Sequence, residues 1–253
     1  MHFIVCHWRV TMGQEKLYNE AWHNWRDMKV YGPASRYLRL LIKEMIRKKL
    51  VFLEVNTVLD VGCGEGTITR MLSDLLPGAE LTGIDISSTA IDYASDKLSR
   101  NKLKFFKEYV ETVRGEFDLV TCFEVLEHVE SWEVFLNELM KRTCRYLMLS
   151  FPTGRMRKFE VNVGHLRNFR KGSVENFLKR EGFMSCGVFY AGFPMYSPLY
   201  RELCNVLNSG SSPITTGEYS FFQKTIAEVF FFFFRYLSFR TRGDQFVGLF
   251  KRI

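Results

Sequence analysis

A glycine-rich loop and a carboxylate further along the chain form the clearest chemical pattern in the sequence. Val58–Gly66 reads VLDVGCGEG, with Gly62, Gly64 and Gly66 where a strand must turn sharply into a helix. Because glycine has no Cβ atom, such a turn lets a ligand approach the backbone closely. Asp85 ends the next apolar run, where a carboxylate can accept both hydroxyls of a ribose. The pattern therefore predicts a nucleoside-binding site.

The charge around this loop indicates which nucleoside would bind. The glycines follow the spacing G-x-G-x-G, which lacks the third-glycine spacing of dinucleotide-binding loops. Asp60 and Glu65 would also repel phosphate groups. A cationic nucleoside therefore fits the loop better than a pyrophosphate, and a glycine turn without any ligand is the alternative.

A second cluster of reactive side chains follows a strand predicted at Phe117–Cys122. Glu124, Glu127 and His128 are spaced three and four residues apart, so on a helix they would share one face. They could hold a divalent cation such as Mg²⁺, which would orient a catechol-like oxygen pair and lower its pKa. Alternatively, His128 could act alone as a general base, or the cluster could only order the loop. His165 could complete the cluster from a later loop.

Strands and helices that alternate along the chain must position these groups. An amphipathic helix is predicted at Ala34–Lys49. Short apolar runs predict five strands, at Thr57–Val61, Glu80–Asp85, Lys104–Lys107, Phe117–Cys122 and Arg145–Phe151. Helical periods lie between them, at Thr67–Leu76, from Ser87 or Ser88 to Leu98, and at Trp132–Met140. This order predicts an α/β fold with a Rossmann-like, doubly wound and mostly parallel sheet.

The rhythm changes after residue 151. A helix that ends at Gly182 precedes a strand at Phe183–Tyr190, and Gly243–Arg252 forms the last strand, which we expect to be antiparallel. Residues 192–242 are too many for an ordinary loop, so this insert should contain helices. We therefore divide the chain into an N-terminal helical segment, 1–50, that packs on a main domain, 51–253.

Three motifs together resemble class I S-adenosylmethionine-dependent methyltransferases. They are the glycine loop, the strand end Gly83–Asp85, and the run from Phe117 to Val129. The likeness covers roughly Pro33 to Phe151. Within that superfamily the sequence is most similar to the O-methyltransferases of ubiquinone biosynthesis, in which a similar VTCxExLEHV run ends the fourth strand. The resemblance implies methyl transfer from S-adenosyl-L-methionine, with Mg²⁺ as a candidate second cofactor.

The resemblance also implies roles for individual residues. Asp85 would hold the ribose, and Gly62 and Gly64 would approach the amino-acid end of the cofactor. Phe123 would lie beside the cofactor, and Glu108 or Tyr109 would approach the adenine. The full cofactor-binding set is Asp60, Gly62, Gly64, Gly66, Asp85, Ile86, Glu108, Phe123 and Arg36. The catalytic set, which is also the candidate metal-ligand set, is His128, Glu124 and Glu127.

Composition limits the classes of partner. The chain has 253 residues, 47% of them hydrophobic, with 35 basic and 28 acidic side chains, which gives a net charge of +7. A moderate positive charge favours phosphate, anionic lipid or nucleic acid as a partner. The six cysteines lie far apart without a C-x-x-C pair, and no export signal is visible. We therefore expect reduced cysteines and a cytoplasmic protein.

A phenylalanine run lies inside the insert. Phe230–Phe234 belongs to the apolar stretch Thr225–Phe239, which is followed by Arg240 and Arg242. A bilayer span needs about 20 apolar residues, so this stretch is too short to cross a membrane. It could lie in the headgroup boundary of a membrane, line a substrate channel, or form a core helix. Together with the aromatic segment Phe193–Tyr200, it favours a lipid-like acceptor at a membrane surface.

The expected activity is O-methylation of a small-molecule or lipid-like acceptor. An RNA methyltransferase with a Glu/His metal site is one alternative, but no RNA-binding module is apparent, so a nucleic-acid partner is disfavoured. A non-catalytic cofactor-binding partner subunit is the other alternative, and the intact glycines and Asp85 argue against it. The sequence indicates no oligomeric state.

Overall fold

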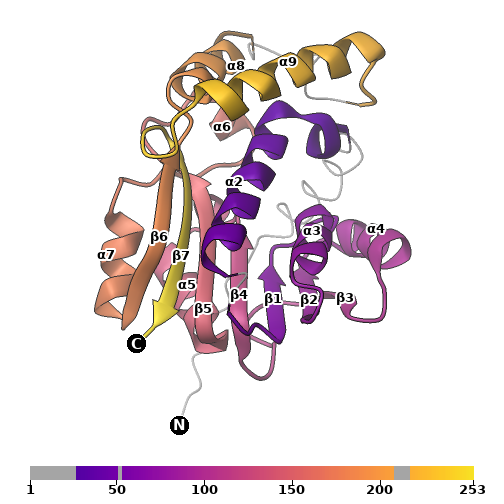
Figure 1. The fold of residues 1–253 in the computed structure, drawn as a ribbon, viewed down its shortest axis with the longest axis vertical. Coiled ribbons are helices and arrows are strands. Elements are labelled where there is room, and N and C mark those ends of the chain that lie inside the picture. Colours follow the sequence, from indigo (N-terminus) through magenta and orange to yellow (C-terminus); the bar gives the residue numbers. More distant parts are fainter. Residues whose placement is uncertain (1–26, 51–52, 208–216) are drawn as a thin grey trace.

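A seven-stranded sheet forms the centre of the computed structural model, which describes residues 27–50, 53–207 and 217–253 (Figure 1). The strand order is β3-β2-β1-β4-β5-β7-β6. The first five strands run parallel, and β7 lies antiparallel between β5 and β6. The strands are β1 Thr57–Val61, β2 Glu80–Asp85, β3 Leu103–Lys107, β4 Phe117–Phe123, β5 Thr143–Pro152, β6 Phe183–Ala191 and β7 Gln245–Arg252. The predicted fold class and the antiparallel last strand are confirmed.

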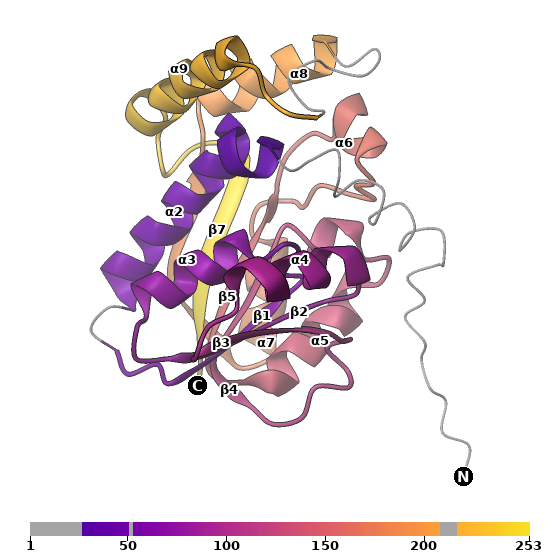
Figure 2. The ribbon, with the colours of Figure 1, turned by 90° about the vertical axis from the view of Figure 1, so that its right-hand side faces the viewer.

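Helices cover both faces of this sheet (Figure 2). One apolar core lies beneath α2, α3 and α4, and the other lies beneath α5 and α7. These helices are α2 Pro33–Lys49, α3 Thr67–Leu75, α4 Ser88–Leu98, α5 Trp132–Arg142 and α7 Ser173–Arg180. The α2 helix buries Tyr37, Leu41 and Ile42 in the first core, because these apolar residues recur at helical spacing. The division at residue 50 stays a prediction, and residues 1–26 lie outside the described part of the chain.

The topology brings three strand ends together. β1 pairs with β2 on one side and with β4 on the other, so the strand order reverses at this point. Ligands of open parallel sheets bind at the carboxyl ends of strands beside such a reversal. Val61, Asp85 and Phe123 end the three strands at this edge. The predicted cofactor and catalytic residues therefore belong to one edge of the sheet.

The insert forms a cap over this edge (Figure 1). It contains the helical turn η2 Met195–Tyr200 and the helices α8 Arg201–Leu207 and α9 Phe221–Leu237. The predicted helices of the insert are therefore confirmed. A short helix that the sequence did not predict, α6 Lys158–Asn162, lies below the cap. Ser220 begins α9, since its hydroxyl accepts a hydrogen bond from the Gln223 amide.

The phenylalanine run of α9 divides between the interior and the surface. Phe234 is fully buried, and its ring packs against Tyr37, Tyr196 and Tyr200 at centroid distances of 5.1–5.7 Å. Phe232 is exposed on the opposite side of the helix. Core packing and surface exposure are thus both present in one run. Among the described residues, no helix is long and apolar enough to cross a membrane.

Candidate active site

The glycine loop between β1 and α3 depends on left-handed backbone angles. Gly62, Gly64 and Gly66 have φ values of 72°, 54° and 80°, which residues with a Cβ atom rarely adopt. A Cβ on Gly62 would lie 2.4 Å from Val125 Cγ2, and one on Gly66 would lie 2.7 Å from the ring of Phe105. The loop therefore packs directly against the segment that follows β4.

Asp85 anchors this loop from the end of β2. One carboxylate oxygen accepts the Gly64 amide at 2.9 Å, and the other accepts the Ser87 amide at 2.8 Å. Burial raises the pKa of Asp85, and these two backbone hydrogen bonds oppose the shift. Each carboxylate oxygen can accept more than one hydrogen bond, so Asp85 can bind ribose hydroxyls while it holds the loop.

Asp60 supports the glycine loop from β1, the strand that precedes it. It is buried at the end of β1, and its two carboxylate oxygens accept the hydroxyls of Thr121, on β4, at 2.7 Å and Thr69, on α3, at 2.6 Å. Burial raises the pKa of Asp60 to about 6 despite both hydrogen bonds. Asp60 therefore joins β1, β4 and α3, which together carry the loop.

The other predicted cofactor residues lie at neighbouring strand ends. The Glu108 amide donates to the Asp85 carbonyl at 3.1 Å, which places Glu108 immediately after β3 and beside the end of β2. Ile86 directly follows Asp85 and is half-buried, and Phe123 is the buried last residue of β4. These positions fit a cationic nucleoside, because carboxylates and one aromatic ring surround the loop.

Arg36 lies against the cap rather than the glycine loop. Its guanidinium is 2.5 Å from a Glu228 carboxylate oxygen and 4.2 Å from the ring centroid of Phe231, both on α9. Arg39, three residues further along α2, donates to the carbonyl oxygens of Lys29 and Val30, and its charge interacts with Glu65 of the loop. Burial lowers the pKa of Arg39 to about 10, and the charge of Glu65 opposes this shift. The helical spacing of the two arginines is a signal that could have indicated Arg39 as well as Arg36.

The E-x-x-E-H motif does not share one helix face, so that prediction is wrong. Glu124 has a φ of 55°, and only Leu126–His128 forms a short 3₁₀ turn, η1. The Glu124 carboxylate instead accepts the Ser150 hydroxyl at 2.7 Å and the Gln245 amide at 2.8 Å. The left-handed backbone at Glu124 prevents a continuous helix between β4 and η1, although the charge of Glu124 still acts on Glu127.

Glu127, His128 and His165 form the actual cluster. Their ligand atoms all lie within 4.8 Å of one another. Glu127 is fully buried, and within the described part of the chain neither of its carboxylate oxygens receives a hydrogen bond from another residue. Burial, together with the charge of Glu124, raises the pKa of Glu127 well above its ordinary value. A buried carboxylate without a donor is costly, and a bound cation or an acceptor hydroxyl would relieve that cost.

The two imidazoles of this cluster are neutral near pH 7. Burial lowers the pKa of His128, and burial together with nearby His128 lowers the pKa of His165 to about 4. The His128 Nδ1 atom lies 3.0 Å from the Gly164 carbonyl oxygen, so Nδ1 carries the proton. The Nε2 atom of His128 is then unprotonated, as a general base or a metal ligand must be.

A cation from the start of the described chain also faces this site. Burial raises the pKa of Asp85, Glu124 and Glu127, and the Lys29 ammonium opposes the shift in all three. Lys29 precedes α2 and belongs to no recognisable motif. Only the folded chain brings Lys29 close enough to act on these carboxylates, so no sequence pattern indicates it.

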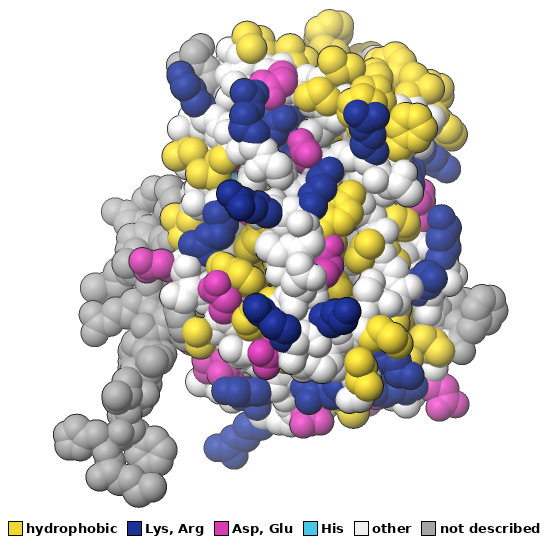
Figure 3. Space-filling model, turned by 90° about the vertical axis from the view of Figure 1, so that its left-hand side faces the viewer, with side chains coloured by type: hydrophobic (Ala, Val, Ile, Leu, Met, Phe, Trp, Pro, Cys, Tyr) yellow, Lys and Arg dark blue, Asp and Glu magenta, His cyan; other side chains and the backbone are white. Residues whose placement is uncertain are grey.

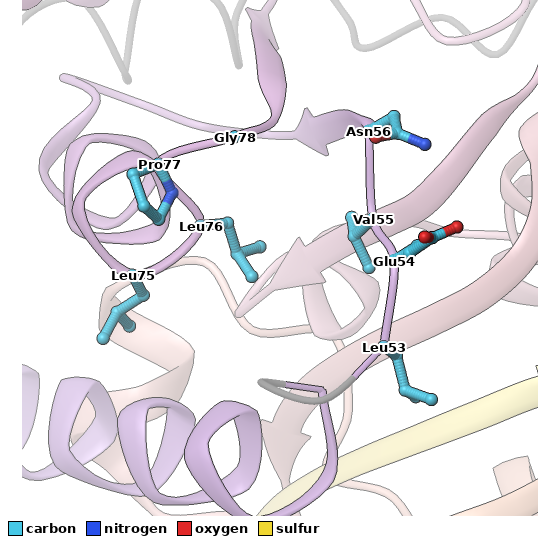
Figure 4. Close-up of a pocket in the computed structure, with 8 residues that line it drawn as sticks. All are labelled: Leu53, Glu54, Val55, Asn56, Leu75, Leu76, Pro77 and Gly78. Carbon is cyan, nitrogen blue, oxygen red and sulfur yellow. The ribbon is translucent and has the colours of Figure 1, made fainter.

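One surface pocket lies far from this chemistry. Its volume is about 340 Å³, and it lies before β1 and after α3, lined by residues 53–56 and 75–78 (Figure 4). These residues stand at the amino ends of β1 and β2, opposite the glycine loop. Glu54 is the only titratable side chain in its lining, so the pocket offers no reactive cluster.

Comparisons with known proteins agree with this geometry. Residues 59–145 match a family described as "Methyltransferase domain". The mitochondrial ubiquinone biosynthesis O-methyltransferase of Schizosaccharomyces pombe is 28% identical over 206 residues, which cover 69% of this chain and 73% of that protein. The corresponding Nitrosospira multiformis enzyme is 34% identical over 124 residues, covering 44% of this chain and 48% of that protein. The chain thus spans about half the length of this bacterial relative.

Solved structures support the same fold. NodS, an N-methyltransferase from Bradyrhizobium japonicum WM9, superposes with a TM-score of 0.59 at 14% identity, covering 94% of this chain and 97% of NodS. The magnesium protoporphyrin IX methyltransferase from Synechocystis PCC 6803, solved with S-adenosylmethionine, gives 0.57 at 16% identity, covering 96% and 99%. The chain thus carries a methyltransferase domain, and its motifs and relatives are those of S-adenosylmethionine-dependent methyltransferases.

Proposed function

We propose that this enzyme methylates an oxygen atom of a small, lipid-like molecule. The observation that carries the proposal is the cluster of Glu127, His128 and His165. Glu127 and His128 lie on the segment whose Val125 packs against Gly62 of the cofactor loop, and His165 joins them from the loop after α6. A base at this point lies between the cofactor edge and the cap. The curated relatives are named for ubiquinone biosynthesis, which suggests an intermediate of that pathway as the acceptor.

The chain's own residues would bind the cofactor and remove one proton. S-adenosyl-L-methionine supplies an electrophilic methyl group on a sulfonium. Gly62, Gly64 and Asp85 would hold its amino-acid and ribose portions at the strand ends. The neutral His128 would accept the acceptor hydroxyl proton at Nε2, since the Gly164 carbonyl occupies Nδ1.

A metal ion is the second candidate for the same cluster. The donor set is one carboxylate and two imidazoles, Glu127, His128 and His165, instead of the two carboxylates and one imidazole that the sequence predicted. Mg²⁺ prefers oxygen ligands, whereas mixed imidazole and carboxylate sets suit Zn²⁺ and other transition metals. A cation held there would lower the pKa of the acceptor hydroxyl, and Zn²⁺ or Mn²⁺ fits the donors better than Mg²⁺.

The cap favours an apolar acceptor. Tyr196, Tyr200 and Phe230 pack with Phe234 on the inner side of the cap, and the Tyr196 hydroxyl bonds Gln245, which donates to Glu124. An aromatic layer that is joined to the site by hydrogen bonds would accommodate an apolar ring better than a nucleic acid. Such an acceptor implies contact with a membrane surface, and a cytoplasmic location stays a prediction.

The test is methyl transfer into a lipid extract. Protein with methyl-labelled S-adenosylmethionine and an extract of the source organism should label one organic-phase product, which mass spectrometry can identify. Glu127→Gln and His165→Gln should lose labelling, whereas the exposed neighbour Glu130→Gln should retain it. Activity that a chelator abolishes and Zn²⁺ or Mn²⁺ restores would favour the metal over the base. Label that enters only RNA, or no product at all, would contradict the proposal.

A further inference from the structure

The outer face of the cap exposes large apolar side chains. Phe221, Phe222 and Phe232 of α9 are 88%, 72% and 55% exposed, and Val206 of α8 is 72% exposed. Hydrophobic side chains gather at the top of the molecule, where these two helices lie (Figure 3). Isolated exposed hydrophobic residues are ordinary, but several on adjoining helices mark an interaction surface.

The aromatic side chains of this face contact one another as well as solvent. The ring centroids of Phe232 and Tyr236 lie 4.9 Å apart, and those of Phe232 and Phe233 lie 5.9 Å apart. The opposite side of α9 buries Ala227 and Phe234 against the rest of the protein. The helix is therefore apolar on both sides, although one buried side would suffice to hold it in place.

The charge beside this face is positive. Arg235 and Arg242 are exposed, and among the described residues neither has an acidic partner within salt-bridge distance. The acidic side chains of α8 and α9 are neutralised, because Glu202 pairs with Arg155 and Glu228 pairs with Arg36. Arg242 also lies 4.1 Å above the ring of Phe193, within the cap. The surface thus combines exposed aromatic side chains with two arginines that lack an acidic partner in the described ranges, against one further exposed carboxylate, Glu218, just before α9.

We propose that the outer face of α8 and α9, with Phe239, docks on an anionic lipid bilayer. Aromatic side chains on such a face enter the boundary between headgroups and acyl chains, and arginines bind the headgroup phosphates. Positive charge distinguishes this partner from a second copy of the chain, which would bring the same arginines to the interface. The inference deepens the proposed function, because it names the surface through which a lipid-like acceptor would arrive.

The position of the cap connects this surface with the reaction. Phe234, on the inner side of α9, packs against Tyr196 at 5.4 Å, and the Tyr196 hydroxyl lies 3.2 Å from Gln245 Oε1. Gln245 in turn donates to Glu124 at 2.8 Å. One helix and one side-chain layer thus separate the proposed bilayer contact from the site. An acceptor embedded in the bilayer would meet the cap before any other part of the enzyme.

Vesicle flotation of the full chain tests this inference. We expect the protein to float with phosphatidylcholine vesicles that contain phosphatidylglycerol, and much less with phosphatidylcholine alone. Phe222→Ser with Phe232→Ser should weaken binding about tenfold or more, because each exposed ring loses its contact with the membrane. Arg235→Gln with Arg242→Gln should weaken binding by a similar factor and reduce its dependence on salt. Val134→Ser with Met184→Ser, exposed apolar residues on α5 and β6, is the matched control.

Several outcomes would overturn the inference. They are absence of the parent protein from anionic vesicles, full retention by the Phe222/Phe232 variant, or equal loss in the control variant. A dimer that the same phenylalanine variant dissociates, without any vesicle binding, would assign the face to a second copy. Calorimetry with S-adenosylhomocysteine on the same samples separates this inference from the proposed function. Cofactor binding and methyl transfer without vesicle binding would overturn the docking surface alone.

Discussion

The two sides of the active site are held together in different ways. On the cofactor side, Asp85 accepts backbone amides from Gly64 and Ser87, and glycines with positive φ shape the loop. On the acceptor side, where Glu124 lies, hydrogen bonds join side chains that are distant in sequence. Gln245, for example, donates to Glu124, which is 121 positions away in the chain. The cofactor side is therefore set by local backbone geometry, whereas the acceptor side depends on the complete fold.

The largest expected effect concerns the cofactor side alone. Asp85→Ala removes the proposed acceptor of two ribose hydroxyls and the observed acceptor of the Gly64 and Ser87 amides. Unpaired hydrogen-bonding groups cost about 1–3 kcal/mol each, so calorimetry with S-adenosylhomocysteine should show an affinity loss of about a hundredfold or more. Asp92→Ala, on the exposed side of α4, is the control. Unchanged affinity in Asp85→Ala would show that this strand end does not bind the nucleoside.

A variant of Asp60 tests whether this buried carboxylate, which lies under the glycine loop, contributes to the stability of the cofactor side. Its pKa in the folded protein is about 6, above the ordinary value of 3.8, so folding favours its protonated form. The stabilisation is present below about pH 4 and is lost as the pH rises through about 6, with a contribution of about 3 kcal/mol. In urea unfolding, the parent protein should lose this free energy of unfolding between the two pH values, whereas Asp60→Asn should not. Parallel pH profiles of the two proteins would refute the assignment.

Removing an acceptor-side residue should spare the cofactor. We expect His128→Gln to slow turnover about a hundredfold, which is the scale of a lost general base. The affinity for S-adenosylhomocysteine should stay the same, because His128 contacts the Gly164 carbonyl rather than the glycine loop. Full activity in this variant would leave the cluster with a structural role only.

The smallest effect should come from the connection between the cap and the site. Gln245→Leu removes the amide that donates to Glu124, and turnover should fall about tenfold, the equivalent of one hydrogen bond to a charged group. Tyr196→Phe keeps that donor and loses only the bond to Gln245, so its effect should be smaller. A loss of cofactor affinity in Gln245→Leu would show that the two sides are not independent.

The same contrast explains which features the sequence could predict. Alternating apolar runs and the glycine loop indicated β1 to β5 and the position of Asp85, because these are local patterns. The left-handed turn at Glu124 and its partner Gln245 could not be predicted, since only β7 pairing beside β5 brings the two together. The sequence predicts Arg36 as a cofactor-binding residue, but the folded cap holds its side chain through Glu228.

The most direct test of the account is hydrogen exchange of the backbone with and without S-adenosylhomocysteine. If the cofactor binds where the three strand ends meet, the amides of residues 61–66, 85–87 and 123–128 should gain protection. The amides of α8 and α9 should exchange as before, because the cap belongs to the acceptor side. Protection confined to the pocket at residues 53–56 and 75–78, or no protection at any of the three strand ends, would contradict the central claim.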